Sequence, residues 1–220
     1  METNHSDHIK RGLAEVRRFR SQLFSTMTAT FKADGGAIYP LDLVVHLVAK
    51  RSLSTATAFV TLVEQHNMVC ARTLLRTQID SVMRLHAFSL VDDPHQMAMK
   101  VLEGEHIRRI KDRHGQKMTD AYLVQKLGKD IEWLERVYER TSGFIHLSNE
   151  FIGLTTEVHG PEDRTMTVKI AEADELPDGS WDEVIRCFLE TSHLILHQID
   201  SWTEMKTQRA TERAAAKAAS

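Results

Sequence analysis

Apolar residues recur at spacings of three, four and seven positions through most of this chain, and that periodicity predicts helices. The pattern is clearest over residues 8–31, where charged side chains surround the apolar stripe. The stripe there consists of Ile9, Leu13, Val16, Leu23 and Met27. A helix with one apolar face must bury that face against other elements. We therefore expect an all-α fold in which several helices pack into a bundle.

Glycine, proline and capping residues divide the rest of the chain into further helices. The glycine pair at residues 35–36 ends the first helix, because glycine adopts backbone angles with which a helix does not continue. Asp93 and Pro94 suit the N-cap and the first position of another helix. Gly128 ends a short helix, and Asp130 caps the next. This punctuation predicts helices over residues 41–50, 53–65, 68–91, 94–112, 119–127 and 131–148.

The pattern changes after Ser148. Residues 151–158 and 164–170 are rich in Thr, Val and Ile, so we expect a β-hairpin over about 151–170, inserted before the C-terminal helix. Ser180 and Glu183 have the spacing of a capping box for that helix. We expect residues 1–206 to form a single mainly helical domain, and the Ala/Lys/Arg-rich residues 207–220 to form a frayed or disordered tail.

Composition restricts the kinds of partner. The chain has 220 residues, enough to bury a full core, and a net charge of −3, so no overall field attracts nucleic acid. Any RNA binding would therefore depend on a local basic site. Cys70 and Cys187 lie in helical apolar patterns, which predicts buried free thiols in a reducing compartment. The N-terminus lacks the apolar core of a signal peptide, and residues 41–49 are too short to span a bilayer. We expect a cytoplasmic protein with no membrane partner.

Polar side chains gather between Val137 and Ser148, at the end of a strongly helical pattern. Tyr138, Ser142 and His146 are four apart and therefore share one helix face. Histidine titrates near neutrality, and an arginine holds phosphate. The segment predicts either an RNA-cleaving or nucleotide-binding site, or a polar seam between packed helices.

Two segments together are similar to a known family. Residues 71–75, Ala-Arg-Thr-Leu-Leu, open a long helix, and the pattern Tyr138-x-x-x-Ser142-x-x-x-His146-x-Ser148 follows about 65 residues later. Over residues 41–148 the chain resembles an HEPN-like (higher eukaryotes and prokaryotes nucleotide-binding) family of all-helical bacterial proteins. That family usually has a glutamate four residues after the arginine, where this chain has Arg76.

The resemblance implies a function as well as a fold. HEPN ribonucleases use an Arg-x4-6-His motif, usually with two copies meeting at a dimer interface, and here Arg140 and His146 fit it. The resemblance thus implies a homodimer that binds RNA or nucleotide, with a role in defence or stress. In a metal-independent endoribonuclease without cofactor, His146 would act as general acid or base and Arg140 would stabilise phosphate charge.

The motif itself is weak, and its geometry is demanding. Roughly three such pairs arise by chance in a chain of this composition. The sequence has four: Arg108–His114, Arg109–His114, Arg140–His146 and Arg186–His193. Residues six apart on a regular helix differ by about 120° and about 9 Å. Arg140 and His146 would thus meet only if their long side chains leaned toward each other, if Gly143 broke the helix, or if two protomers shared the site.

Further candidates lie on an earlier helix. Arg72, Arg76, Asp80 and Arg84 are four apart, a strip that could face phosphate, so Arg72 and Arg76 join Tyr138 and Ser142 as candidate substrate-binding residues. The alternative is a solvated or interhelical ion-pair face.

Two other classes of function stay open. The pairs Glu103–His106 and Glu190–His193, with His197 one turn further on, could serve a metal-binding bundle. A non-catalytic helical interaction module would need none of these groups.

Overall fold

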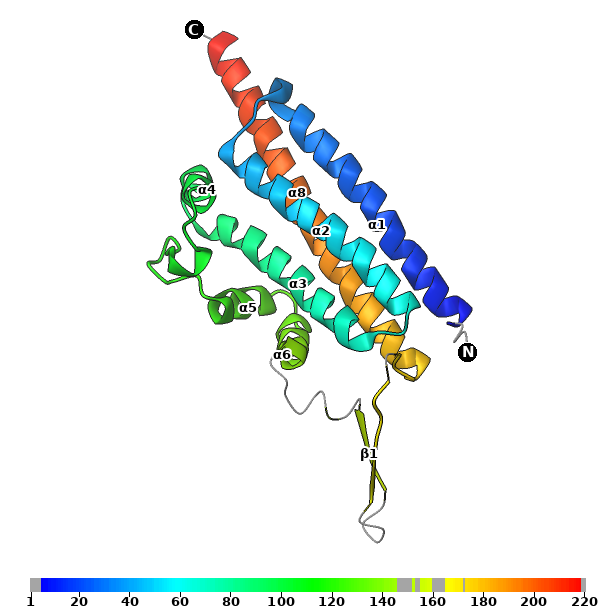
Figure 1. Ribbon diagram of the computed structural model, residues 1–220. Helices are drawn as coiled ribbons and strands as arrows, with labels where there is room; N and C mark the ends of the chain where they lie inside the picture. The colour runs from blue at the N-terminus through cyan, green and yellow to red at the C-terminus, as the bar shows by residue number, and fades with distance from the viewer. Residues whose placement is uncertain (1–4, 146–151, 153–154, 160–164, 172, 219–220) are drawn as a thin grey trace.

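The computed structural model describes residues 5–145, 152, 155–159, 165–171 and 173–218. Its centre is a bundle of long helices (Figure 1): α1 (Asp7–Lys32), α2 (Pro40–Glu64), α3 (Met68–Ala87) and α8 (Asp178–Ala218). Shorter helices lie along α2 and α3: α4 (Pro94–Leu102), α5 (Asp120–Gly128) and α6 (Leu134–Ile145). The prediction of an all-α fold is confirmed.

The first and last long helices form the most extensive helix pair of the bundle. The predicted apolar stripe of α1 is buried, and Phe19 joins it. The backbone of Gly12 approaches α8 so closely that an added Cβ would lie 2.8 Å from Ile185. Phe59 of α2 stacks on Phe188 of α8 with ring centroids 4.0 Å apart. The core therefore joins elements from both ends of the chain.

The second helix corrects one prediction. Residues 41–50 and 53–65 belong to a single helix, α2, which passes through the expected break. The hydroxyls of Ser54, Thr55 and Thr57 donate to carbonyls four residues earlier, so these weak helix formers are satisfied within the helix. By length and composition α2 could cross a membrane, but half of its apolar window is buried inside the bundle, as in a core helix.

Three further helix boundaries differ from the prediction. The helix that starts at Pro94 ends at Leu102 rather than near residue 112, and Gly104 follows with a φ of +101°. The third helix becomes a 3-10 turn, η2 (Phe88–Leu90), beyond Ala87. The helix expected directly after Asp130 begins at Leu134.

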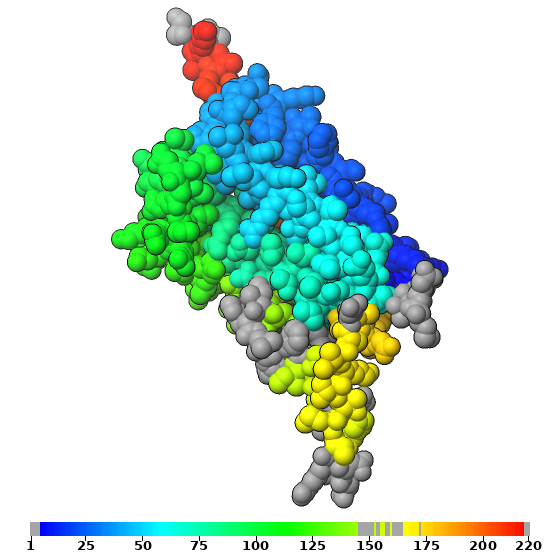
Figure 2. Space-filling view, in the orientation of Figure 1, coloured from blue at the N-terminus to red at the C-terminus, as the bar shows by residue number. Residues whose placement is uncertain are grey.

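The expected β-hairpin is present but short. β1 (Thr156–Val158) and β2 (Met166–Val168) pair antiparallel, with Glu157 opposite Thr167. The hairpin projects from one end of the body and the last turns of α8 from the other (Figure 2). After the hairpin, the backbone N–H of Asp174 donates to His66 at 2.7 Å, and its carboxylate accepts from Met68 at 2.8 Å. These bonds fix the entry to α8 against the turn between α2 and α3.

The last helix is longer than predicted at both ends. It begins at Asp178, two residues before the expected capping box. It continues to Ala218, so the described residues 207–218 are helical where a frayed tail was expected. Arg213 in this extension donates to Asp34 and to the Tyr39 hydroxyl, which ties the extension to the turn after α1.

Candidate functional site

Helix α6 packs across α3 and brings three of the predicted site residues, Arg76, Tyr138 and Ser142, together. The guanidinium of Arg76 lies over the Tyr138 ring, 3.8 Å from its centroid. Its Nε donates to Ser142 Oγ at 3.1 Å. One turn earlier on α3, the guanidinium of Arg72 lies 4.8 Å from the centroid of the Phe144 ring. The predicted pairing of the Tyr138–Ser142 face with the helix opened by Arg72 is therefore present.

Arg76 serves to join the two helices. Its side chain is only 11% exposed, and its remaining charge faces Asp80 at 3.9 Å. The Ser142 hydroxyl in turn donates to the Tyr138 carbonyl at 2.7 Å. Arg76 thus has a ring face, a hydroxyl and a carboxylate around it at the position where the HEPN-like family has a glutamate. This arrangement is a polar seam between packed helices.

The carboxylate of Asp80 collects the other charges of this strip. It lies 3.1 Å from Arg51 of α2 and 2.9 Å from Arg84, which also reaches Asp120 of α5 at 2.7 Å. The alternative prediction, an interhelical ion-pair face, is confirmed for Arg76, Asp80 and Arg84. Arg51 and Asp120 were not predicted to take part, because their helices could not be placed from spacing alone.

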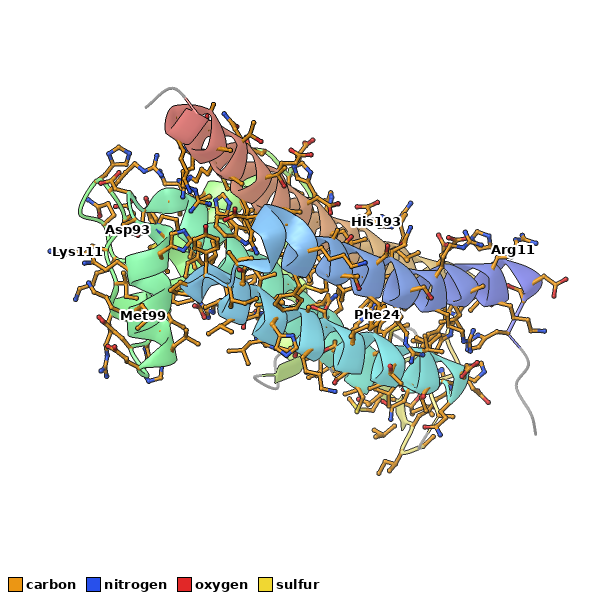
Figure 3. All side chains as sticks on the ribbon, turned by 90° about the horizontal axis from the view of Figure 1, so that it is seen from above. Arg11, Phe24, Asp93, Met99, Lys111 and His193 are labelled. Carbon is orange, nitrogen blue, oxygen red and sulfur yellow. The ribbon has the colours of Figure 1, made fainter. Side chains whose placement is uncertain are left out.

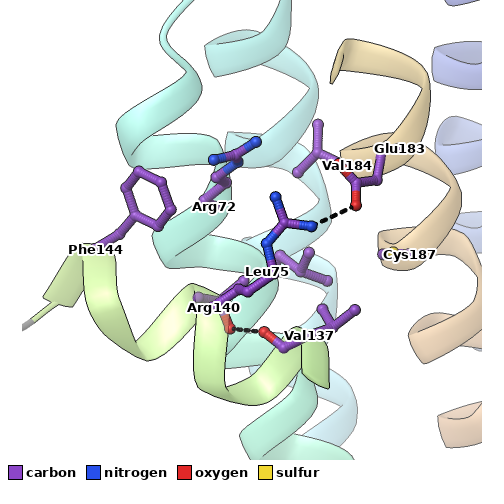
Figure 4. Close-up of a pocket in the computed structure, with 9 residues that line it drawn as sticks. Arg72, Leu75, Val137, Arg140, Phe144, Glu183, Val184 and Cys187 are labelled. Atoms are coloured by element: carbon purple, nitrogen blue, oxygen red, sulfur yellow. Dashed lines mark hydrogen bonds and ion pairs between the residues drawn. The ribbon is translucent and has the colours of Figure 1, made fainter. Parts of the chain in front are cut away.

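Arg72 and Arg140 instead line a small pocket between α3, α6 and α8 (Figure 4). Nη1 of Arg140 lies 3.0 Å from Oε1 of Glu183, and both side chains are about half exposed. Leu75, Val137 and Val184 give the pocket an apolar lining. Its volume is about 30 Å³, so it admits a water-sized group and no base. We call this pocket, lined by Arg72, Arg140, Glu183, Leu75, Val137, Val184 and Phe144, the arginine pocket.

The thiol of Cys187 also lines the arginine pocket, but little of it is ionised at neutral pH. Burial, followed by the charges of Glu183 and Glu190, raises the pKa of Cys187 to about 11. The prediction of two buried thiols is corrected, because Cys70 is exposed and Cys187 is half-buried. Met68 and Ala71 occupy the core-facing positions around Cys70.

The predicted catalytic pair is only partly described. Arg140 lies on the side of α6 that faces α8, whereas Tyr138 and Ser142 face α3. His146 lies outside the described residues. Helix α6 continues through Gly143 to Ile145, so a break at Gly143 does not bring the pair together.

The residues of the metal alternative lie on separate elements. Glu103 and His106 follow α4, and Glu190 and His193 lie on α8. Within the described part of the chain, no three His, Cys, Asp or Glu side chains are close enough together to hold a metal ion.

A basic segment between α4 and α5, residues 103–117, was not predicted as a site. It contains five Lys and Arg residues and three carboxylates in a chain of net charge −3. Four of its cations, Arg108, Arg109, Lys111 and Lys117, are exposed and make no ion pair with any described residue. Lys111 points away from the body at one edge of the molecule (Figure 3). The density of Lys and Arg in an acidic chain was the signal that could have identified this segment.

Internal bonds hold the basic segment in place. The buried carboxylate of Asp112 accepts the Tyr122 hydroxyl at 2.5 Å and the backbone N–H groups of His114 and Gln116. These bonds, that from Tyr122 first, lower the pKa of Asp112. Arg113 donates to the carbonyls of residues 89, 90 and 91 after α3. The four exposed cations therefore project from a turn that internal hydrogen bonds hold in place.

No protein-family model matches this chain, and comparisons with curated proteins and with solved structures find no match either. The HEPN-like resemblance stays a prediction that depends on residues 71–75 and 138–148.

Proposed function

We propose that the protein binds RNA, and that the basic segment contacts the phosphate backbone. The observation that supports this most is the set of four exposed cations without ion-pair partners among the described residues. Unpaired Lys and Arg side chains release counterions when they meet phosphates, and this release supplies most of the affinity for a nucleic-acid backbone. The basic segment supplies the local positive charge that RNA binding by an acidic chain requires.

We further propose that Arg140 and His146 cleave the bound RNA. The Arg140–Glu183 pair is half exposed, and such pairs contribute little free energy, so a phosphate could replace Glu183 at little cost. Arg140 and Arg72 would then face one phosphodiester at the mouth of the arginine pocket. His146 would take the proton of the 2′-hydroxyl or supply one to the leaving oxygen. A homodimer, as the resemblance implies, would bring two such sets together.

Binding is tested by the fluorescence anisotropy of a labelled single-stranded RNA, titrated at several salt concentrations. The test variant replaces Arg108, Arg109, Lys111 and Lys117 with Gln. A control with the same net charge replaces Arg11, Arg20, Lys32 and Lys50, which are exposed on α1 and α2. Arg11 lies at the opposite end of the molecule from Lys111 (Figure 3). We expect the slope of log affinity against log salt concentration to become less steep by up to about 3 in the test variant. Equal losses in both variants would contradict the proposal.

Cleavage is tested with the same RNA in the presence of a chelator. We expect product from the wild type and loss of product in His146→Ala and Arg140→Gln. The control is His193→Ala, an exposed histidine on α8 (Figure 3). Cleavage that His146→Ala leaves unchanged would exclude this pair as the catalytic site.

A second candidate, a helical interaction module, is favoured by apolar side chains exposed on α1 and α2. Phe24 is 71% exposed, and Leu43 and Leu47 are exposed one turn apart. A second copy of this chain is the partner that we test. We expect a dimer by light scattering that Leu43→Ser with Leu47→Ser converts to monomer. A wild-type monomer at high concentration would contradict this candidate.

A further inference from the structure

A second cavity lies where α8 passes the turn before α2 and the start of α4. Its volume is about 450 Å³, within the range of small-molecule sites. Tyr39, His95 and Trp202 line it together with Arg209 and Arg213 of α8. We call it the aromatic–basic cavity. It is far larger than the arginine pocket and shares no residue with it.

Three rings form one wall of the cavity. The His95 ring centroid lies 5.2 Å from that of Tyr39 and 5.2 Å from that of Trp202. The Tyr39 and Trp202 rings are nearly perpendicular, at 88°. The indole N–H of Trp202 donates to the buried carboxylate of Asp42 at 2.7 Å, which fixes that ring. Rigid rings that meet at different angles offer both faces and edges to a flat aromatic ligand.

Four charged side chains line the cavity, and among the described residues two of them, Lys206 and Arg213, are in ion pairs whereas Arg209 and Glu212 are not. Lys206 is bonded to Asp42, and Arg213 to Asp34. Glu212 accepts a hydrogen bond from Gln208 at 2.9 Å. Arg209 makes no ion pair with any described residue. The cavity therefore has one cation whose counter-charge the described chain does not supply.

His95 provides an unpartnered polar atom beside this cation. Its Nδ1 is shielded from solvent and has no hydrogen-bond partner among the described residues. Burial, followed by the positive charge of Arg209, lowers the pKa of His95. A neutral imidazole nitrogen that lacks a partner accepts or donates a hydrogen bond according to its tautomer.

We propose that the aromatic–basic cavity binds a small aromatic anion, and specifically a nucleoside monophosphate. The base packs against Tyr39, His95 and Trp202, a polar group of the base meets His95 Nδ1, and the phosphate pairs with Arg209. The volume matches a mononucleotide, and the wall of rings distinguishes the site from a plain phosphate site. This inference is independent of RNA binding by the basic segment.

The test is equilibrium binding of AMP, adenosine and inorganic phosphate, measured by calorimetry on the full chain. We expect AMP to bind more tightly than either fragment. Arg209→Gln should weaken AMP binding roughly tenfold or more, because it removes a charge-assisted contact. The matched control is Arg186→Gln, which replaces an exposed arginine earlier on α8 and should bind AMP as the wild type does. Because Arg209 supports no ion pair, its replacement should leave the fold intact.

A second readout distinguishes contact from an indirect effect. A phosphate bound at Arg209 adds negative charge near His95, so AMP should raise the pKa of His95 in an NMR titration, and adenosine should raise it less. The variant without the four cations of the basic segment should bind AMP normally. No AMP binding at millimolar concentration, equal binding of phosphate alone, or an Arg209→Gln variant with unchanged affinity would each overturn the proposal.

Discussion

The ammonium nitrogen of Lys206 lies 3.0 Å from a carboxylate oxygen of Asp42, and neither side chain is exposed to solvent. Lys206 also donates to the Thr30 carbonyl at 3.0 Å, and Asp42 accepts the Trp202 indole and the backbone N–H of Tyr39. Both charges are therefore hydrogen-bonded inside the protein. This pair joins α8 to the end of α1 and the start of α2, beside the aromatic–basic cavity.

Removing only the cation should destabilise the protein strongly. Lys206→Met leaves the Asp42 carboxylate buried without its counter-charge, so we expect a loss of about 3–5 kcal/mol in the free energy of unfolding. Urea denaturation measures this, with the exposed Lys50→Met as control. Adding Asp42→Asn removes the orphaned charge and still accepts the Trp202 N–H, so the double variant should recover part of the loss. A single variant as stable as the control would show that the pair contributes nothing.

Helix α6 should depend on the planar guanidinium of Arg76. Arg76→Lys keeps the charge but loses the Nε–H donor to Ser142 and the flat stack on Tyr138, so we expect a cost of about 1–2 kcal/mol. A double-mutant cycle with Tyr138→Leu should give a coupling energy of about 1 kcal/mol. Arg20→Lys, on the exposed side of α1, is the control. Additive effects of the two substitutions would contradict a direct stack.

Stability should fall as the pH drops below about 6.5. Burial lowers the pKa of His86, so the unfolded chain binds a proton at a pH where the folded protein does not. The contribution of His86 is therefore complete above the unfolded pKa and is lost as the pH falls toward the folded value. We expect the unfolding free energy of His86→Gln to change less between pH 7.5 and pH 5.5 than that of the wild type. His193→Gln should retain the full pH dependence.

The two cysteines should react at very different rates. Cys70 is exposed, whereas the pKa of Cys187 is raised to about 11, so little of its thiol is ionised at pH 8. Mass spectrometry after brief maleimide treatment should find one modified residue, at Cys70, and denaturant should make the second thiol reactive. Rapid modification of Cys187 in the folded protein would contradict the described environment.

Local patterns in the sequence predicted which helices form. Contacts between distant parts of the chain set the residues at which those helices begin and end. The stripe of α1 was predicted because an apolar face leaves a regular trace in the sequence. The continuity of α2 was missed because hydroxyl side chains resemble a break until their bonds to the preceding turn are seen. In the helical extension beyond residue 206, Arg213 contacts Asp34, a residue far away in the sequence that local patterns do not connect with it.

The candidate sites could likewise be predicted from the sequence only in part. Periodicity alone placed Tyr138 and Ser142 on one face, and the family resemblance paired that face with the helix of Arg72. The partner of Arg140 could not be predicted, because Glu183 comes from a helix whose position depends on the whole bundle. The aromatic–basic cavity combines residues from three elements, so no single stretch of sequence indicated it.

The pairing of α1 with α8 also affects how the protein is made. On the ribosome the apolar stripe of α1 emerges early, but its main partner begins only at Asp178. Until then only α2 can cover part of that stripe, and the nascent chain exposes the rest to chaperones and to neighbouring nascent chains. Formation of the native bundle during translation therefore waits for the last helix.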